Sequence, residues 1–562
     1  MTEALIAGAG PTGLTLACEL AWRGVPVRII DARPEPSRHS KAIGVFPRTL
    51  ELLENHGVAE RMVERGVRVR GVNVHAEGRR LARIDTGRIA SHYNFVLTLE
   101  QSETERFLIE RLGALGVRVE RPVELVSLHQ DCGAVHAVLE TGPEREGARQ
   151  PDAEREAVSV PWLVGCDGSR SFVRESLGVS FEGERYQEAF NLADVELHGE
   201  VPDARDHINL FLSRDGVMFA APLPGGRHRL IADEPPGSAS EERPDPTLDD
   251  FSGWWRRRVE YFPAKRAELA APGWLSRFTI QRRMAPSVRE GRVLLAGDAM
   301  HVHSPAGAQG MNGGIQDAVN LGWKLALVAT GAASQALLDS YGAERLPVAR
   351  EVLKATHVGT TVLTSRNPVV GLVRNRAMSL VLRSDLVQRR AVNSAAELRV
   401  NYRRSPIVEG EGRRRPMAPV AGDRAPDTPL ARSETLRLYD ALRQPGHTLL
   451  VFAGKQPVED DDLRRAAEVL GEVEDRYGEL VSGYLVVVGP EASRSVEART
   501  VLLDPDGAAH MRYGMQKTGL CLLRPDRYVA LRTESLDSQR LHDHLERSLP
   551  REGRQARMEA QG

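Results

Sequence analysis

A glycine-rich turn close to the start of the chain constrains the fold most. Leu5-Ile6-Ala7 is a short apolar run that predicts a buried strand, and 14–20 has the apolar spacing of a helix. Between them lies Gly8-Ala9-Gly10-Pro11-Thr12-Gly13. In such a strand–turn–helix unit the first glycine makes the turn, the second admits a pyrophosphate and the third lets the helix pack on the strand. The turn therefore predicts dinucleotide binding at a helix N-terminus.

An acid in the right place strengthens this interpretation. Val27-Arg28-Ile29-Ile30 predicts the second strand, and Asp31, followed by Ala32 and Arg33, stands directly after it. A carboxylate there suits a ribose diol. A plain glycine turn with a surface Asp31 is the alternative. No second unit of this kind is evident, so a nicotinamide cofactor would have no domain of its own.

Two further segments have the same form. Residues 162–165 predict an apolar strand that ends in Cys166-Asp167-Gly168-Ser169, with Val173-Arg174 beyond it. Residues 292–296 predict another buried strand, which ends in Gly297-Asp298-Ala299. A glycine-rich loop from Pro305 to Gly314 and a helix over 315–327 follow.

Taken in this order, the three segments resemble the class A flavoprotein monooxygenases, the para-hydroxybenzoate hydroxylase superfamily. The resemblance covers most of residues 1–400. It is nearest to the branch that hydroxylates phenols and aromatic polyketides, on Gly297 to His301, Gly310-Met311-Asn312 and Gln316 to Lys324. It implies an α/β fold with a Rossmann-like FAD-binding domain, an inserted antiparallel sheet that contributes substrate contacts, and a thioredoxin-like C-terminal domain.

The resemblance also implies roles for single residues. Asp31 would hold the adenosine ribose, Gln101 would contact the flavin side of FAD, and Asp167 would lie near FAD and affect nicotinamide use. Asp298 would accept a hydrogen bond from a ribityl hydroxyl, and Pro305 would line the oxygen-reacting face. Backbone N–H groups of Gly310, Met311 and Asn312 would face the pyrimidine end of the flavin, where a helix N-terminus stabilises negative charge.

One position departs from the family pattern. Ser40-Lys41-Ala42 stands where relatives commonly have Ser-Arg-Ala, whose arginine reaches the FAD pyrophosphate. Lysine keeps the charge and loses the bidentate fork. Lys41 is kept as a phosphate contact, with Arg33 and Arg38 as nearby substitutes.

Several of these residues have simpler explanations. Asp298 could cap a helix. His301 and His303 could suggest a metal, but without a third ligand a packing role is favoured. Arg282 and Arg283 could face the substrate or form salt bridges. The cysteines, which lack a CxxC pattern, are expected to be buried thiols without a redox role; they are Cys18, Cys132, Cys166 and Cys521.

Composition excludes other classes of function. The chain has 75 basic and 77 acidic residues and a net charge of −2, which gives no support for a nucleic-acid or anionic-membrane partner. No apolar run reaches the ~18 residues of a membrane span. The first predicted strand leaves no room for a signal peptide, and four unpaired cysteines suit a reducing compartment, so a cytoplasmic location is expected.

The domain organisation follows from composition shifts. We expect the first part of the FAD domain in 1–175 and a substrate-binding sheet in 176–280, with strands at 190–197, 208–212, 217–222 and 228–232. The second part of the FAD domain and helices follow in 281–402, and an Arg-, Pro- and Gly-rich linker in 403–429. The thioredoxin-like domain without CxxC spans 430–550, with strands at 448–452 and 484–488, a helix near 460–477 and a role in packing or in a homodimer.

The predicted function is that of an FAD-dependent aromatic hydroxylase that uses O2 and NAD(P)H, NADPH being favoured. By resemblance, FAD is non-covalent, and the substrate is a small aromatic molecule, phenolic and polycyclic, that is oxygenated through a flavin C4a-hydroperoxide. Baeyer–Villiger oxidation or epoxidation of the same substrates is the first alternative. A reductase or a silent flavoprotein scaffold is another. A halogenase is disfavoured, because Trp254-Trp255 does not fit the Trp-x-Trp-x-x-Pro segment of those enzymes.

Overall fold

The structure is a computed structural model. It describes residues 2–37, 40, 42–142, 154–235, 243–303, 309–381, 384–410, 418–430, 436–455, 460–489 and 501–549. The chain divides into two compact units. Unit 1 comprises 1–21, 26–318 and 346–398, and unit 2 comprises 22–25, 319–345 and 399–562. Among the helices of the described residues, none is both long and apolar enough to cross a membrane.

Unit 1 contains a six-stranded sheet of order β18-β19-β12-β1-β2-β8. All neighbouring strands are parallel except the β18–β19 pair. The central strands read as continuous apolar runs because both faces are covered. The strands are β1 (Ala4–Ala7), β2 (Val27–Ile30), β8 (Val119–Glu120), β12 (Trp162–Gly165), β18 (Arg289–Glu290) and β19 (Val293–Leu295).

Helices follow several of these strands directly. Helix α1 (Pro11–Trp22) begins after β1, and α5 (Phe172–Ser176) follows β12. Helix α4 (Gln101–Ala114) differs, because it comes directly before a strand of this sheet, β8. The predicted strand–turn–helix units are therefore present, with α1 starting at the proline of the glycine turn.

The second large sheet of unit 1 has eight strands, in the order β20-β17-β13-β16-β15-β14-β5-β6. The four strands expected between 190 and 232 lie within β13 to β16. The sheet also includes β5 and β6 from the first hundred residues, and β5 pairs in parallel with β14. The strands are β5 (Gly71–Ala76), β6 (Arg79–Asp85), β13 (Glu182–His198), β14 (His207–Ser213), β15 (Gly216–Pro222), β16 (Arg227–Asp233), β17 (Glu268–Met284) and β20 (His301–Val302).

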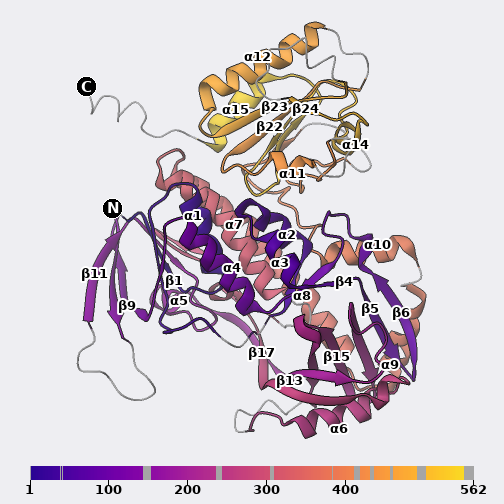
Figure 1. The fold of residues 1–562 in the computed structure, drawn as a ribbon. Coiled ribbons are helices and arrows are strands. Elements are labelled where there is room, and N and C mark those ends of the chain that lie inside the picture. Colours follow the sequence, from indigo (N-terminus) through magenta and orange to yellow (C-terminus); the bar gives the residue numbers. More distant parts are fainter. Residues whose placement is uncertain are drawn as a thin grey trace. The chain divides into compact units, whose positions relative to one another are not determined.

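Helix α6 (Leu248–Arg258) covers one face of this sheet (Figure 1). Phe251 and Trp255 of α6 pack in a buried cluster with Phe211 and Leu230 of the sheet. Trp255 donates its indole N–H to the Ala264 carbonyl at 3.0 Å. It is therefore a core residue. Residues of the opposite face, such as Phe219 and Ala221, pack against Ile43.

Two smaller sheets complete the strands of unit 1. One joins β9 (Val123–Gln130), β10 (Val135–Thr141) and β11 (Glu154–Val160). The other joins β3 (Gly44–Val45), β7 (Val96–Thr98) and β4 (Val67–Val69). After β3 come α2 (Pro47–Leu53) and α3 (Ala59–Arg65).

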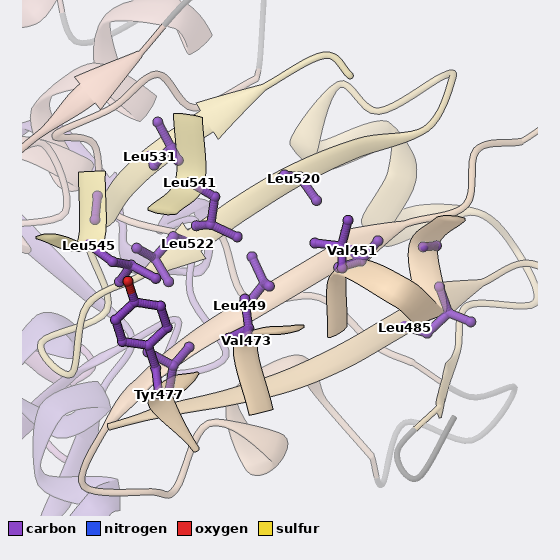
Figure 2. Packing of buried hydrophobic residues seen from close by; sticks show 14 of the residues in the cluster. Leu449, Val451, Val473, Tyr477, Leu485, Leu520, Leu522, Leu531, Leu541 and Leu545 are labelled. Carbon is purple, nitrogen blue, oxygen red and sulfur yellow. The ribbon is translucent and has the colours of Figure 1, made fainter. Parts of the chain in front are cut away.

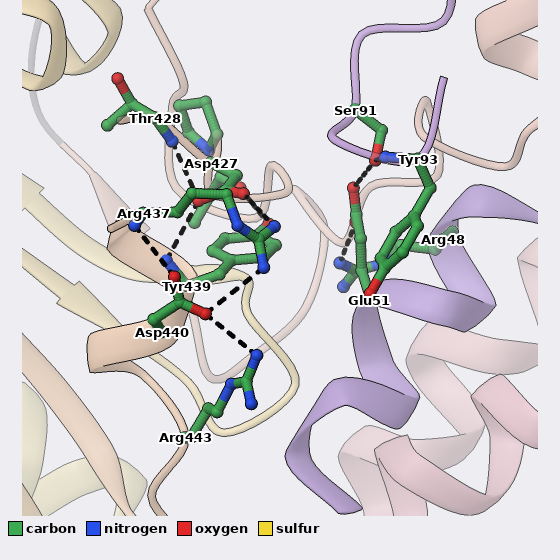
Figure 3. Close-up of polar contacts among 12 residues, drawn as sticks. Arg48, Glu51, Ser91, Tyr93, Asp427, Thr428, Arg437, Tyr439, Asp440 and Arg443 are labelled. Atoms are coloured by element: carbon green, nitrogen blue, oxygen red, sulfur yellow. Dashed lines mark hydrogen bonds and ion pairs between the residues drawn. The ribbon is translucent and has the colours of Figure 1, made fainter. Parts of the chain in front are cut away.

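A buried polar cluster fixes α2 (Figure 3). Arg48 donates from Nη1 to Glu51 Oε2 at 3.1 Å, and Ser91 Oγ donates to Glu51 Oε1 at 2.6 Å. Arg48 and Glu51 are both buried, so the charge of each side chain compensates the desolvation of the other. The cluster ties α2 to the segment that leads into β7.

Long helices follow the second large sheet in the sequence. They are α7 (Gly310–Ala329), α8 (Asp339–Thr364), α9 (Pro368–Val381) and α10 (Asp385–Ala395). Helix α9 packs on β6. The first residues of α7 belong to unit 1 and the rest to unit 2; for α8 the order is reversed.

One buried ion pair joins two strands of the eight-stranded sheet to a loop of the FAD-domain segment. Arg229 of β16 donates from Nε and Nη2 to the two oxygens of Asp194 of β13, both at 2.7 Å. Its Nη1 donates to the Ser40 carbonyl at 2.5 Å. Arg229 is only 1% exposed, so the pair is shielded from water. Neither residue was singled out in the sequence.

The C-terminal part of unit 2 is built on a six-stranded sheet of order β21-β26-β25-β22-β23-β24. β22, β23 and β24 are parallel, and β25 pairs antiparallel with β22 and β26. The expected strands and the helix at 460–477 are present. The strands are β21 (Glu409–Gly410), β22 (His447–Phe452), β23 (Val481–Val487), β24 (Val501–Leu503), β25 (Gly519–Leu523) and β26 (Val529–Thr533).

The helices α12 (Asp460–Tyr477) and α15 (Ser538–Ser548) pack on one face of this sheet (Figure 2). Val473 and Tyr477 of α12 and Leu541 and Leu545 of α15 meet strand residues such as Leu449 in a buried cluster. The shorter helices α11 (Leu438–Ala441) and α14 (Ala508–Tyr513) contribute to a second cluster. The sheet is thus covered on both faces.

Asp427 holds the connection that precedes α11 (Figure 3). Its Oδ1 accepts the backbone N–H groups of Thr428 and Tyr439, each at 3.0 Å, and its Oδ2 accepts from Arg437 Nη1 at 2.8 Å. A single carboxylate therefore satisfies two backbone donors and one guanidinium.

A second buried charge cluster of unit 2 connects residues far apart in the sequence. Glu344 of α8 accepts from Lys324 of α7 at 2.7 Å and from both terminal nitrogens of Arg524, at 2.5 and 2.8 Å. Arg524 also donates to Asp526 at 2.6 Å. The two cations and two carboxylates give this buried cluster no net charge, which limits the cost of removing the charges from water.

The cysteine prediction was wrong at one position. Cys18, Cys166 and Cys521 are buried, but Cys132 is exposed. Cys132 lies between β9 and β10, where the chain turns at the surface. Burial raises the pKa of Cys18 and of Cys521 to about 12, which makes both thiols inert.

We predict that the buried His447 makes the unfolding free energy fall as the pH is lowered. Burial, and then the charge of Arg524, lower its pKa to about 3 from an ordinary 6.5. Below pH 6.5 the His447 imidazole is protonated in the unfolded chain but stays neutral in the folded chain. The unfolding free energy therefore falls as the pH falls towards 3, by about 1.4 kcal/mol per pH unit. His447→Gln should flatten this slope in urea titrations between pH 6.5 and 4.5. The exposed His129→Gln variant should leave it unchanged; equal slopes in all three proteins would refute the assignment.

We also predict strong coupling between Arg229 and Asp194. Arg229→Met leaves the Asp194 carboxylate buried without its partner, which should lower the unfolding free energy by roughly 3–5 kcal/mol. Arg229→Met combined with Asp194→Leu removes both charges and should recover most of that loss. The measurement is urea unfolding of the four apoproteins in a double-mutant cycle. Additive losses would show that the two side chains act independently.

Candidate active site

The glycine turn has the geometry that its three glycines predict. Gly8 has φ +101°, and a Cβ there would lie 2.3 Å from the Cys166 carbonyl oxygen. A Cβ on Gly13 would lie 1.9 Å from the Gly8 carbonyl oxygen. Gly10 differs, since a Cβ there would have nothing within 4 Å. Gly8 and Gly13 are thus required by packing, while Gly10 leaves open space at the N-terminus of α1.

Asp31 stands at the end of β2, beside this turn. It accepts the backbone N–H groups of Ala9 and Arg33, both at 2.9 Å, and pairs with Arg121 at 3.0 Å. Burial raises its pKa, but the hydrogen bond from Arg33 and the charge of Arg121 outweigh burial, so the net pKa is lowered. Asp31 is therefore an ionised acceptor, and Ala32 follows it at the surface.

Arg121 is a site residue that the sequence did not reveal. It follows β8 directly, and its Nη2 also donates to the Ala9 carbonyl at 3.4 Å. No motif surrounds it. Its position became apparent only because β8 pairs with β2, which brings both strand ends together.

The segment after β12 forms a second polar turn. Asp167 Oδ2 accepts the Val173 N–H at 3.0 Å in the first turn of α5, and Ser171 caps the helix by accepting the Arg174 N–H at 2.9 Å. Burial raises the pKa of Asp167. Its Oδ1 is buried and has no hydrogen-bond partner within the described part of the chain.

The third turn follows β19. Gly297 has φ +62°, and a Cβ there would lie 2.5 Å from Thr12 Oγ1. A Cβ on Gly314 of α7 would lie 2.3 Å from the same oxygen. Thr12 is therefore enclosed by the third turn and α7, and the Asp298 side chain is exposed at this turn.

Two further side chains fix the third turn. Asp317 Oδ2 accepts the Gly297 N–H at 3.2 Å and pairs with His301 Nε2 at 2.9 Å. Arg174 of α5 donates to the Ala299 carbonyl and to the Ser169 carbonyl, each at 3.1 Å. The second and third turns are thus joined through Arg174.

His301 has a structural partner. It pairs with Asp317, and its ring stacks on His303 with centroids 6.2 Å apart. Within the described ranges, no group of three or more His, Cys, Asp or Glu side chains could hold a metal ion. Arg282 likewise pairs with Glu184 at 3.5 Å.

The N-terminus of α7 begins at Gly310. Asn312 is buried, and both polar atoms of its side chain bond to backbone groups of the protein. Its Oδ1 accepts the Phe46 N–H at 2.8 Å, and its Nδ2 donates to the Gly44 carbonyl at 2.9 Å. These bonds fix β3 against the first turn of α7. Gly310 and Met311 are half-buried, and the backbone N–H groups of this turn are those of a helix N-terminus.

Gln101 begins α4 and fastens the loop that precedes β3. Its backbone N–H donates to the Ala42 carbonyl at 3.1 Å, and its Oε1 accepts the Ala42 N–H at 3.3 Å. Its Nε2 donates to Glu105 at 2.9 Å. Ser40 and Ser102 add a hydroxyl contact of 3.1 Å. Lys41, Arg38 and Pro305 lie outside the described residues, so their predicted roles stay predictions.

These turns share one edge of the parallel sheet. β1, β2, β8, β12 and β19 run in the same direction, so their carboxyl ends lie together. Open space at Gly10 and the ionised Asp31 fit the diphosphate and a ribose hydroxyl of a dinucleotide such as FAD. The individual contacts to the cofactor stay predictions.

Comparison with known proteins agrees with this geometry. Residues 1–356 match the family model described as FAD binding domain. The chain is 38% identical to 6-methylpretetramide 4-monooxygenase of Streptomyces rimosus, over 94% of this chain and 90% of that protein. It is 34% identical to pentachlorophenol 4-monooxygenase of Sphingobium chlorophenolicum, over 94% and 93%.

Solved structures agree as well. Anhydrotetracycline hydroxylase from Streptomyces rimosus superimposes with a TM-score of 0.74 at 29% identity, covering 97% of this chain and 98% of that one. Aklavinone-11 hydroxylase, solved with FAD and aklavinone, gives 0.74 at 26% identity, covering 98% and 99%. The chain belongs to the class A flavoprotein monooxygenases, in the aromatic polyketide hydroxylase branch, and is an FAD-dependent aromatic monooxygenase.

Proposed function

We propose that the chain hydroxylates a phenolic, polycyclic substrate of the aromatic polyketide class, using O2 and NAD(P)H, with NADPH preferred. The observation that carries this proposal is the convergence of three polar turns at the carboxyl edge of one parallel sheet, next to the N-terminus of α7. The substrate class follows from relatives that act on pretetramides and anhydrotetracycline. Its identity and the position of oxygenation are part of the proposal.

The proposed cofactor contacts follow the order of the turns. The N-terminus of α1, left open at Gly10, would bind the diphosphate, and Asp31 would accept from the ribose of the adenosine half. Asp298 would accept from a ribityl hydroxyl, and Gln101 would hold the loop that contains Lys41. When bound, FAD supplies electron transfer from NAD(P)H and activation of O2.

The N-terminus of α7 has the electrostatic role. Its backbone N–H groups and the helix dipole stabilise negative charge at the flavin end of the site. The Asn312 side chain does not compete for this role, because both its polar atoms are bonded to the β3 segment. Asn312 therefore positions the helix end, and the backbone of Gly310 to Asn312 makes the contact.

The eight-stranded sheet would bind and orient the substrate. The face opposite α6 carries the partly buried apolar residues Ile208 and Phe219, which suit a flat aromatic molecule. The Arg229–Asp194 pair joins this sheet to Ser40, one residue before Lys41. Such a link would hold the substrate sheet and the cofactor loop in a fixed relative position and help to exclude water from the site.

The other expected properties remain part of the proposal. A homodimer, a cytoplasmic location and a thioredoxin-like assignment of the C-terminal sheet are expectations from the sequence. The parallel β22, β23 and β24, followed by the antiparallel β25 and β26, support the thioredoxin-like assignment. The sequence has no CxxC pattern, which argues against dithiol chemistry in this part of the chain.

We predict a yellow protein whose pyridine nucleotide oxidation depends on substrate. The purified chain should bind FAD non-covalently, oxidise NADPH faster than NADH, and consume more O2 when polycyclic phenols are added. Mass spectrometry should find a product heavier by one oxygen, and NMR should place that oxygen in a ring hydroxyl. A ring-inserted or epoxide oxygen would establish the alternative chemistry. NADPH oxidation without any oxygenated product from the tested phenols would count against hydroxylation.

We predict that substitutions at two glycines of the first turn affect different properties, FAD affinity at Gly10 and stability at Gly13. Gly10→Ala adds a methyl group to open space, so the thermal unfolding midpoint of the apoprotein should be unchanged while FAD affinity falls at least about tenfold, since backbone approach to the diphosphate is blocked. Gly13→Ala forces a methyl group against the Gly8 carbonyl and should destabilise the apoprotein itself. Flavin fluorescence titration and thermal unfolding measure the two effects. Unchanged FAD affinity in Gly10→Ala would exclude the proposed diphosphate position.

A further inference from the structure

The end of helix α10 holds a glutamate in an unusual backbone conformation. Glu397 has φ +60°, in the left-handed region that residues with a Cβ rarely adopt. Its N–H donates to the Ser394 carbonyl at 3.1 Å. The next N–H, of Leu398, donates to the Asn393 carbonyl at the same distance, and the two bonds form the Schellman pattern that ends many helices. Glycine is the usual residue at this left-handed position, so a glutamate there indicates that its side chain has a role.

The side chain of Glu397 bonds to helix α7. Its Oε2 accepts a hydrogen bond from Gln316 Nε2, and both residues are buried. Gln316 lies one helical turn after Asn312, so the two side chains share one side of α7. Asn312 bonds to the backbone of the β3 segment, and Gln316 bonds to the end of α10. The beginning of α7 is thus held at two adjacent points by polar side chains.

Helix α10 is itself packed on the eight-stranded sheet. It contacts β6, and Ile84 of that strand packs against a buried cluster that includes Val392 of α10. Asn393 of α10 accepts the Ala90 N–H with its Oδ1 at 2.8 Å, a few residues beyond the end of β6. These residues and Gln316 all belong to unit 1. The Glu397 carboxylate therefore joins the beginning of α7 to the eight-stranded sheet through α10.

We infer that Glu397 is a positioning residue for the flavin, which holds the first turns of α7 relative to the eight-stranded sheet. The inference rests on the proposed contact between the N-terminus of α7 and the flavin. The stabilisation of negative charge by a helix N-terminus falls off within one turn, so it depends on where the helix end lies. Reduced flavin carries the negative charge. Loss of the bond to Gln316 should therefore weaken the binding of reduced FAD more than that of oxidised FAD.

Redox titration of the FAD-loaded full chain tests the inference. Glu397→Gly removes the carboxylate and keeps the end of α10, because glycine suits the left-handed backbone. Reduced FAD should then bind about tenfold more weakly relative to oxidised FAD, which lowers the two-electron midpoint potential by about 30 mV. Gln316→Leu should lower it similarly. Glu397→Gln should keep the wild-type potential, because an amide oxygen still accepts the hydrogen bond from Gln316.

The sign of the shift separates position from charge. Removal of a negative charge near the flavin would by itself favour the reduced anion and raise the potential. Glu77→Gly is the matched control. Glu77 also has a left-handed backbone, with φ +53°, and accepts from the amide of Asn375 of α9 at 3.1 Å, but it lies in the turn between β5 and β6. Its substitution should leave the potential unchanged.

Bound FAD, seen in the visible spectrum, shows that each variant is folded. A potential that Glu397→Gly raises or leaves unchanged overturns the inference, and so does an equal shift in Glu397→Gln. Asn312→Ala separates this failure from a failure of the proposed α7 contact. If only Asn312→Ala lowers the potential, α7 contacts the flavin and the role of Glu397 alone is wrong. If none of Asn312→Ala, Gln316→Leu and Glu397→Gly lowers it, the proposed contact is wrong as well.

Discussion

The site depends on how closely three turns of the backbone approach one another. Thr12 is enclosed by Gly297 and Gly314, and Gly8 lies against the Cys166 carbonyl, at distances that leave no room for a Cβ. The parallel sheet brings the strand ends to one edge, but glycine at these positions lets the turns meet. Within the first turn, Gly8 and Gly13 are required by packing and Gly10 leaves open space, so this single motif combines a structural and a binding role.

Two buried carboxylates of unit 1 have guanidinium partners. Asp31 has Arg33 and Arg121, and Asp194 has Arg229. The Asp31–Arg121 and Asp194–Arg229 pairs join segments distant in the sequence, and removal of an arginine would leave a buried carboxylate with less compensation for its desolvation. In helix α9 the buried Arg374 instead donates hydrogen bonds to two backbone carbonyl groups. The valines in the first half of α9 are exposed.

Much of the local structure could be predicted from the sequence because it rests on local rules. Apolar runs ending in Gly8, Cys166 and Gly297 indicated strands that open into turns, and the four strands between 190 and 232 were confirmed. The family was likewise confirmed by comparison. Burial of Cys132 was a wrong prediction, since a residue in a hairpin turn is exposed whatever its type. Arg121, Asp194 and Arg229 were missed because their partners lie in other strands or loops.

The sequence by itself determined the order of the turns, their glycines and acids, and hence the family and its cofactor class, because these features depend on backbone conformation and on chemistry within a few residues. Only the tertiary structure decided which charges pair, that β5 and β6 join the substrate sheet, and that α9 faces its valines outward. Those outcomes depend on which strands and helices meet across long stretches of chain. Periodicity shows that a helix has two faces, but only the packed fold decides which one is left uncovered.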